Sequence, residues 1–140
     1  MSRQQLTFPQ QRIVIYGAGR GGKIVAEVLS FDDHVQVIGF VDDDPALWGQ
    51  HIFGLKVLGG REELENLHIH GHLDAVIVSI ASPGTMDVRT QIYLDLKRAG
   101  FQFINANHPA AVVSPSAVLG ENNILSPGVV IDTEAHLGDN

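Results

Sequence analysis

The sequence contains no cysteine among its 140 residues, which excludes disulfide bonds and thiolate metal sites. It also has no apolar run close to the roughly 20 residues that a membrane-crossing helix needs, so no membrane insertion is expected. The amino-terminal segment MSRQQLTFPQQR lacks a hydrophobic signal core. These absences together predict a cytoplasmic protein.

Basic residues are few and scattered: 9 Lys and Arg stand against 16 Asp and Glu, a formal net charge of −7. A nucleic-acid-binding surface needs clustered Lys and Arg to displace counterions, so a nucleic-acid partner is not expected. An acidic chain can still bind a phosphate group where backbone N–H groups face it.

The first hundred residues alternate between strand-like and helix-like segments. Predicted strands cover 12–16, 35–41, 74–80 and 101–104, and predicted helices cover 24–29, 61–67 and about 86–99. The 74–80 segment is apolar without alternation, which is typical of a central strand buried on both faces. Strands that alternate with helices form parallel sheets, so the sequence predicts an α/β fold with a small Rossmann-like domain.

A glycine motif, G-x-G-x-x-G, follows the first predicted strand directly and opens the first helix. Its first glycine permits a tight turn, its second lets a phosphate approach the backbone, and its third permits close helix–strand packing. The helix amino terminus also offers N–H groups to an anion. The alternative is a glycine turn that serves packing alone. The predicted phosphate-binding residues are Gly17, Gly19, Arg20, Gly21, Gly22 and Lys23.

Further candidate ligand contacts follow the second and third predicted strands. Asp42 lies where an acidic side chain meets a ribose hydroxyl or a base edge in such folds, and Asp43 follows it. Asp44 precedes Pro45 and is better explained as a solvated turn residue. Ser82 lies in the loop after the third strand.

Arg89, one turn into the next predicted helix, is the last candidate for ligand contact, with a solvent-facing helix charge as the equal alternative. No metal site is expected. Consecutive carboxylates on one turn rarely converge on one ion, and the HIHGH segment at 68–72 is better explained as an exposed loop than as a zinc site.

Residues 112–140 repeat every six positions, with a large aliphatic side chain once per unit: Val113, Leu119, Leu125, Ile131 and Leu137. A six-residue repeat of this kind is typical of a parallel β-helix in which each hexad forms one flat face of a coil. The run covers fewer than five hexads. Because so short a stack leaves an open β edge, we expect this chain to be the front part of a longer protein.

The two halves together resemble the bacterial nucleotide-sugar acetyltransferases, typified by sialic acid O-acetyltransferases and bacillosamine or perosamine N-acetyltransferases. The blocks that carry the resemblance are IVIYGAGRGGKIVAEVL, VIGFVDDDP, GLKVLGG, DAVIVSIAS and NHPAAVVSPSAVLGENN. It implies a nucleotide-sugar-binding domain over residues 1–109, with phosphates on the glycine loop and the base at Asp42 and Asp43. Residues 110–140 would then begin a left-handed β-helix that forms homotrimers.

The resemblance also implies acetyl-CoA as co-substrate and glycan biosynthesis as the setting. The catalytic His and the acetyl-CoA site would lie beyond residue 140, so no catalytic residue is expected here and the chain alone should bind without catalysing. Arg20-Gly21 stands where the family usually has Gly-His, which implies a different hold on the substrate. Two alternatives stay open, an NAD(P)-binding oxidoreductase domain and a non-catalytic nucleotide-binding trimerisation module.

Deletion of residues 111–140 is expected to leave the first domain folded and able to bind its ligand, because the hexads lie outside the predicted sheet. Circular dichroism of the deletion variant measures this directly. Loss of all secondary structure would contradict the predicted boundary.

Overall fold

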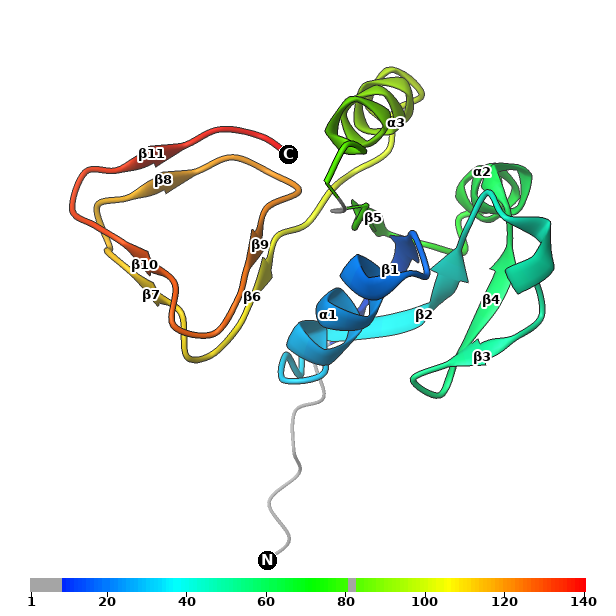
Figure 1. The fold of residues 1–140 in the computed structure, drawn as a ribbon, viewed down its shortest axis with the longest axis horizontal. Helices are drawn as coiled ribbons and strands as arrows, with labels where there is room; N and C mark the ends of the chain where they lie inside the picture. Colours follow the sequence, from blue (N-terminus) through cyan, green and yellow to red (C-terminus); the bar gives the residue numbers. More distant parts are fainter. Residues whose placement is uncertain (1–8, 81–82) are drawn as a thin grey trace, which may run out of the picture.

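The computed structural model describes residues 9–80 and 83–140, which form a five-stranded sheet flanked by helices and a separate triangular set of short strands (Figure 1). The elements of the first part are β1 Gln11–Tyr16, α1 Arg20–Leu29, β2 Val35–Val41, the 3₁₀ turn η1 Pro45–Leu47, β3 His51–Ile52, β4 Leu55–Gly59, α2 Arg61–Ile69, β5 Ala75–Val78 and α3 Met86–Arg98. Within the described residues, no helix has the length and apolar character needed to cross a bilayer.

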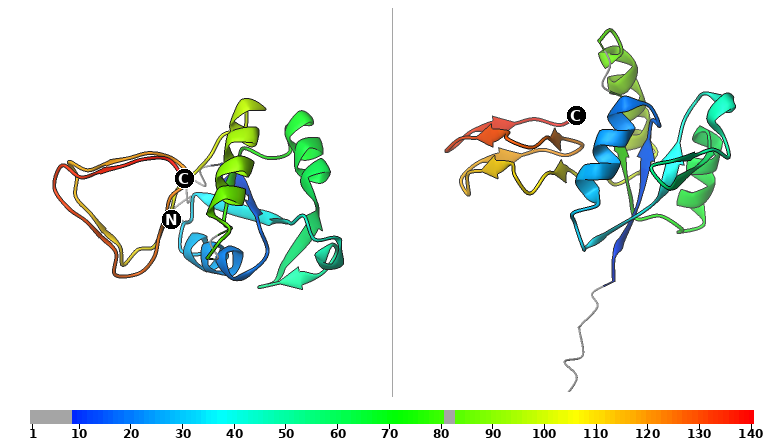
Figure 2. Two further views of the ribbon diagram at one scale, coloured as in Figure 1. Left: turned by 45° about the horizontal axis from the view of Figure 1, so that its top comes forward. Right: turned by 60° about the horizontal axis from the view of Figure 1, so that its bottom comes forward.

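The sheet order is β3-β4-β2-β1-β5, with β4, β2, β1 and β5 parallel and β3 antiparallel to β4. Side chains of β1 alternate between two cores. Ile13 and Ile15 join the core under α1, whereas Val14 and Tyr16 join the core under α2 and α3. Figure 2 shows the corresponding layers, with α1 on one face of the sheet and the other two helices on the opposite face. This is the predicted Rossmann-like α/β arrangement.

Several details differ from the sequence-based expectation. β5 is buried on both faces, but it ends the order of named strands instead of lying at its centre. The predicted strand over 101–104 is reduced to one parallel bridge between Val76 and Phe103, which covers the outer edge of β5. The β3–β4 hairpin was not predicted, because His51–Ile52 is too short to show periodicity.

The second part is a triangle of three strand pairs (Figure 1). Its strands are β6 Ala106–Asn107, β7 Val112–Val113, β8 Val118–Leu119, β9 Ile124–Leu125, β10 Val130–Ile131 and β11 His136–Leu137. Each parallel pair joins residues eighteen positions apart, as Val112 and Val130 are. One circuit of the triangle therefore uses three hexads. We call this part the coils.

The backbone of the coils turns with the same period of six. Residues in the left-handed region recur at Asn122 (φ 58°), Gly128 (φ 82°), Glu134 (φ 56°) and Asn140 (φ 63°). Gly and Asn tolerate this region at the lowest steric cost, which accounts for three of the four. The repeat seen in the sequence is thus a repeat of corners as well as of inward side chains.

A buried polar junction joins the coils to the sheet at the end of β5. The side-chain amide of Asn122, which is fully buried, accepts from the Val78 N–H at 2.7 Å and donates to the Val78 carbonyl at 3.3 Å. Arg89 on α3 donates to the Asn122 carbonyl at 2.9 Å and to Asn140 Oδ1 at 2.9 Å. Because position 140 follows position 122 by one circuit, Arg89 holds equivalent corners of two successive coils.

Replacing Asn122 with Gly is expected to lower the free energy of unfolding by about 1–3 kcal/mol, because the buried Val78 N–H and carbonyl both lose their partner. Glycine keeps the left-handed backbone, so the loss reports the amide alone. The matched control is Glu134→Gly, an exposed residue with almost the same φ. Urea denaturation of both variants measures the difference, and equal stability would contradict the role given to the amide.

Candidate functional site

The glycine loop lies at the carboxyl edge of the sheet, between the end of β1 and the start of α1. Gly17 adopts φ +109°, and its N–H donates to the Val41 carbonyl at 2.8 Å, which ties the loop to β2. A Cβ on Gly22 would lie 2.0 Å from the Gly17 carbonyl oxygen. The third glycine of the motif is therefore required for α1 to pack directly on the backbone of the loop.

The outer side of the loop is open. A Cβ on Gly19 would meet no atom within 4 Å, and Gly19 begins α1 without a side-chain cap. Arg20 and Lys23 are exposed on the first turn of the helix, and Gly21 is half-buried between them. This arrangement presents the positive end of a helix and two cations, which suits an anionic group.

The Asp42 carboxylate braces the glycine loop. Its Oδ2 accepts from the Ala18 N–H at 2.8 Å, and its Oδ1 accepts from the Asp44 N–H at 2.9 Å. Asp42 is half-buried, and it connects the end of β2 to the loop after β1. Asp42 is predicted from the sequence as a ligand contact. The structure adds an internal role, which sequence spacing does not show.

Asp43 is exposed, and its Oδ1 accepts from the Tyr16 hydroxyl at 2.6 Å. Tyr16 is 2% exposed. Burial, followed by the hydrogen bond to Asp43, raises the pKa of Tyr16 well above its usual value, so the hydroxyl stays a donor. Tyr16 was not among the residues predicted from the sequence. A polar aromatic as the last residue of the strand before a glycine motif is the signal that points to it.

The three consecutive carboxylates diverge, because Asp44 caps η1 by accepting from the Ala46 N–H at 3.0 Å. Over the described ranges 9–80 and 83–140, no group of three or more His, Asp or Glu side chains is placed to share a metal ion. In the HIHGH segment, His68 lies on α2 and stacks on Phe101 with ring centroids 4.1 Å apart, so it is not a loop residue.

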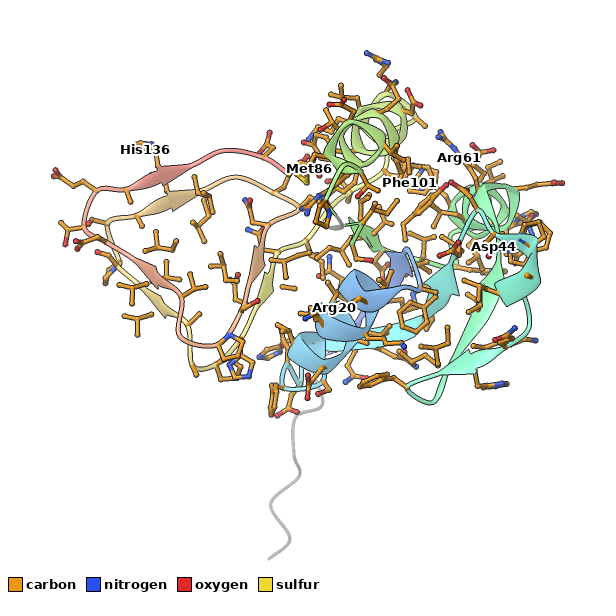
Figure 3. All side chains as sticks on the ribbon, in the orientation of Figure 1. Arg20, Asp44, Arg61, Met86, Phe101 and His136 are labelled. Carbon is orange, nitrogen blue, oxygen red and sulfur yellow. The ribbon has the colours of Figure 1, made fainter. Side chains whose placement is uncertain are left out.

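A cavity of about 720 Å³ opens beside Asp43, between Trp48, the end of β4 and α2. Its wall includes Trp48, Gly60 and Arg61. The indole N–H of Trp48 donates to the Asp42 carbonyl at 2.8 Å, which fixes the ring beside the acidic turn. The labels in Figure 3 show Arg61 and Asp44 on the side of the sheet away from the coils.

The end of β5 also supports the glycine loop. Ser79, 1% exposed, places its Oγ 3.0 Å from both the Tyr16 and Gly17 carbonyl oxygens, so its hydroxyl donates to this backbone. Ser82 lies outside the described residues. The Arg89 guanidinium is buried, which lowers its pKa, and its hydrogen bonds run to the coils. The predicted solvent-facing alternative for Arg89 is therefore wrong.

Gly22→Ala is expected to destabilise the protein by about 1–3 kcal/mol, because the added methyl overlaps the Gly17 carbonyl oxygen and forces the loop and helix apart. Gly19→Ala provides the matched control, since its methyl points into open space and should cost less than about 1 kcal/mol, the loss expected when alanine replaces glycine at a helix N-cap. Thermal unfolding of the two variants tests this, and a Gly19→Ala loss equal to that of Gly22→Ala would contradict it.

The chain is similar to one protein family and to several individual proteins. Residues 12–96 match the family described as the PglD N-terminal domain. A probable polysaccharide biosynthesis protein, EpsC of Bacillus subtilis (strain 168), is 31% identical over 91 residues, which is 64% of this chain and 15% of EpsC. The chain therefore spans only a small part of this curated relative.

Solved structures of acetyltransferases are similar to this chain over most of its length. Perosamine N-acetyltransferase from Caulobacter crescentus, in complex with CoA and GDP-perosamine, matches with a TM-score of 0.80 and 35% identity over 91% of this chain and 57% of that one. The acetyltransferase domain of PglB from Neisseria gonorrhoeae FA1090, in complex with acetyl coenzyme A, matches with a TM-score of 0.80 and 28% identity over 93% and 60%. The chain belongs to the PglD N-terminal domain family, the amino-terminal part of bacterial nucleotide-sugar acetyltransferases.

Proposed function

We propose that this chain is the nucleotide-sugar-binding part of an acetyltransferase that moves an acetyl group from acetyl-CoA to an amine or hydroxyl of a nucleotide-linked sugar. The observation that carries the proposal is the open glycine loop at the carboxyl edge of the sheet, with the coils joined to the same edge at the end of β5. Family membership supports the reaction class. Within residues 1–140 we assign binding of the sugar nucleotide and no catalytic residue.

The phosphates of the ligand would lie on the glycine loop. Gly17 and Gly22 set the backbone of the loop, Gly19 leaves it open, and Arg20 and Lys23 add positive charge. Backbone N–H groups at a helix amino terminus bind phosphate regardless of the overall charge of the protein. Arg20 and Gly21 adapt the loop to the sugar, and Ser82 stays a candidate contact.

The coils are proposed to be the first coils of a left-handed parallel β-helix, with residues 1–109 forming the nucleotide-sugar domain and 110–140 beginning the helix. The six-residue period of corners and the pairing of strands eighteen residues apart support this assignment. In such a protein, acetyl-CoA would be bound by the coils, and the PglB domain is one relative seen with acetyl coenzyme A.

A homotrimer formed through the coils is proposed as the assembly. Val112, Val118 and Val130 are 62%, 53% and 68% exposed on the outer side of the coils. Exposed aliphatic rows of this kind are typical of surfaces covered by another subunit. A cytoplasmic setting in glycan biosynthesis is part of the same proposal.

Two other functions are less well supported. An NAD(P)-binding oxidoreductase domain accounts for the glycine motif but not for the coils. The structure of RSP in complex with β-NADH, 22% identical, shows a similar fold alone. A non-catalytic nucleotide-binding trimerisation module accounts for both parts, but the solved relatives that match over both parts are acetyltransferases.

The test is a thermal-shift panel of this chain with UDP-linked and GDP-linked amino sugars, NADH and acetyl-CoA. A ligand at about a hundred times its dissociation constant stabilises by about 2.7 kcal/mol, which raises the midpoint by several degrees. We expect a shift with a nucleotide sugar and none with NADH. Gly19→Ala serves as the site control, since its methyl would occupy the open face of the loop and reduce the shift. A shift with NADH alone would overturn the proposal.

A further inference from the structure

The peptide group between Gly17 and Ala18 is held at both ends by side chains from outside the glycine loop. On the β5 side, Ser79 Oγ lies 3.0 Å from the Gly17 carbonyl oxygen. On the β2 side, Asp42 Oδ2 accepts from the Ala18 N–H at 2.8 Å. The carbonyl and the N–H of a trans peptide point in opposite directions, and β1 lies between β2 and β5 in the sheet. This peptide group therefore extends the hydrogen-bonding pattern of the sheet, with two side chains in place of the neighbouring strands.

The surroundings of Ser79 direct its hydroxyl to this task. Ser79 is 1% exposed, so bulk water does not compete for the hydroxyl. The Tyr16 carbonyl oxygen, also 3.0 Å from Oγ, already accepts from the Ser79 N–H at 2.9 Å. The hydroxyl thus supplies a donor to the next carbonyl along the chain, that of Gly17. A Cβ on Gly17 would lie 3.0 Å from Ser79 Oγ, so glycine at this position leaves room for the hydroxyl.

The same carbonyl oxygen of Gly17 also sets the position of α1. The helix begins at Arg20, and a Cβ on Gly22 would lie 2.0 Å from this oxygen. A displacement of the oxygen would therefore move the amino terminus of the helix. The first N–H groups of a helix have no partner within it, and these are the groups that bind a phosphate. A contiguous set of contacts thus runs from the Ser79 hydroxyl to the predicted anion site.

We propose that Ser79 is a positioning residue for phosphate binding. Its hydroxyl holds the Gly17 carbonyl oxygen, and through it the amino terminus of α1, in the arrangement that a bound phosphate needs. The proposal rests on the proposed function and adds the residue that orients its anion site; Ser79 acts through the loop and does not contact the ligand. The apolar strand pattern of 74–80 gives no sign of this role, because Gly17 is 62 positions away.

The first test measures amide hydrogen exchange, which needs no ligand. In Ser79→Ala the peptide group keeps only its bond to Asp42, so the Ala18 N–H should exchange at least about tenfold faster, the effect expected of one lost hydrogen bond. The N–H of Ile15, a fully buried residue of β1, should change much less. A general loss of stability would instead accelerate both amides alike.

The second test measures affinity for UDP, GDP and inorganic pyrophosphate by NMR titration. These probes share a diphosphate group and differ in the rest of the molecule. Ser79→Ala should weaken each probe that binds the wild-type chain by the same factor, about tenfold, because the change acts on the phosphate contacts alone. Ser79→Cys nearly keeps the volume of the side chain but offers only a weak S–H donor, so it should behave like Ser79→Ala.

Ser30→Ala is the matched control. The Ser30 hydroxyl donates to the Glu27 carbonyl at 2.6 Å at the opposite end of α1, so the same deletion there should leave the affinities and the Ala18 exchange rate unchanged. Wild-type affinity in both Ser79 variants, or equal acceleration of Ala18 and Ile15 exchange, would overturn the positioning role and leave the proposed function intact. If no probe binds the wild-type chain, the proposed function fails, and the role of Ser79 in phosphate binding fails with it.

Discussion

The close approach of Gly22 to the Gly17 carbonyl oxygen is the constraint on which the rest of the site depends. It brings the amino terminus of α1 onto the loop that leaves β1. Two further hydrogen-bonding groups hold the loop. The Asp42 carboxylate accepts from the Ala18 N–H, and the Ser79 hydroxyl donates to the Tyr16 and Gly17 carbonyl oxygens. A loop fixed in this way has little conformational entropy left to lose when a ligand binds.

The glycine loop lies at the edge of the sheet where the parallel strands end. All parallel strands of the sheet end at this edge, so groups that follow β2, β4 and β5 lie in a row across it. The short antiparallel β3 covers the outer edge of β4, and the 101–104 segment covers that of β5. The coils attach beside β5, where Asn122 bonds to Val78, and also at α3, where Tyr93 donates to Glu121.

The local sequence pattern is sufficient to predict the glycine loop, the six-residue repeat of the coils, and helices α2 and α3. The glycine motif marks a tight turn between a strand and a helix. The aliphatic residue at every sixth position marks a backbone that repeats with the same period. The glycine loop lies between β1 and α1 as predicted, and the strands of the coils begin with β6 at Ala106. The predicted helices over 61–67 and 86–99 correspond to α2 and α3, because their apolar spacing is also local.

What could not be predicted depends on contacts between distant residues. Asn122 and Val78 are joined through an amide that mimics a neighbouring strand, and no periodic signal marks such an Asn. Tyr16 ends an apolar strand, and nothing in that pattern shows that its hydroxyl donates to Asp43. Arg89 has the spacing of a surface charge, yet it is 7% exposed because the coils cover it. In each case the partner is more than twenty positions away.

The burial of Arg89 shows that the contact between α3 and the coils includes polar hydrogen bonds. Taking a guanidinium out of water is costly, and its partners here are neutral amide oxygens, so the contact is a weak source of stability. Its planar donors instead match oxygens on equivalent corners of two successive coils, which an apolar side chain cannot do. Hydrogen bonds are directional, whereas apolar burial tolerates rotation of one surface over another. A polar junction therefore helps to fix the angle between coils and sheet, and the proposed transfer between ligands held by the two parts would need that angle to be constant.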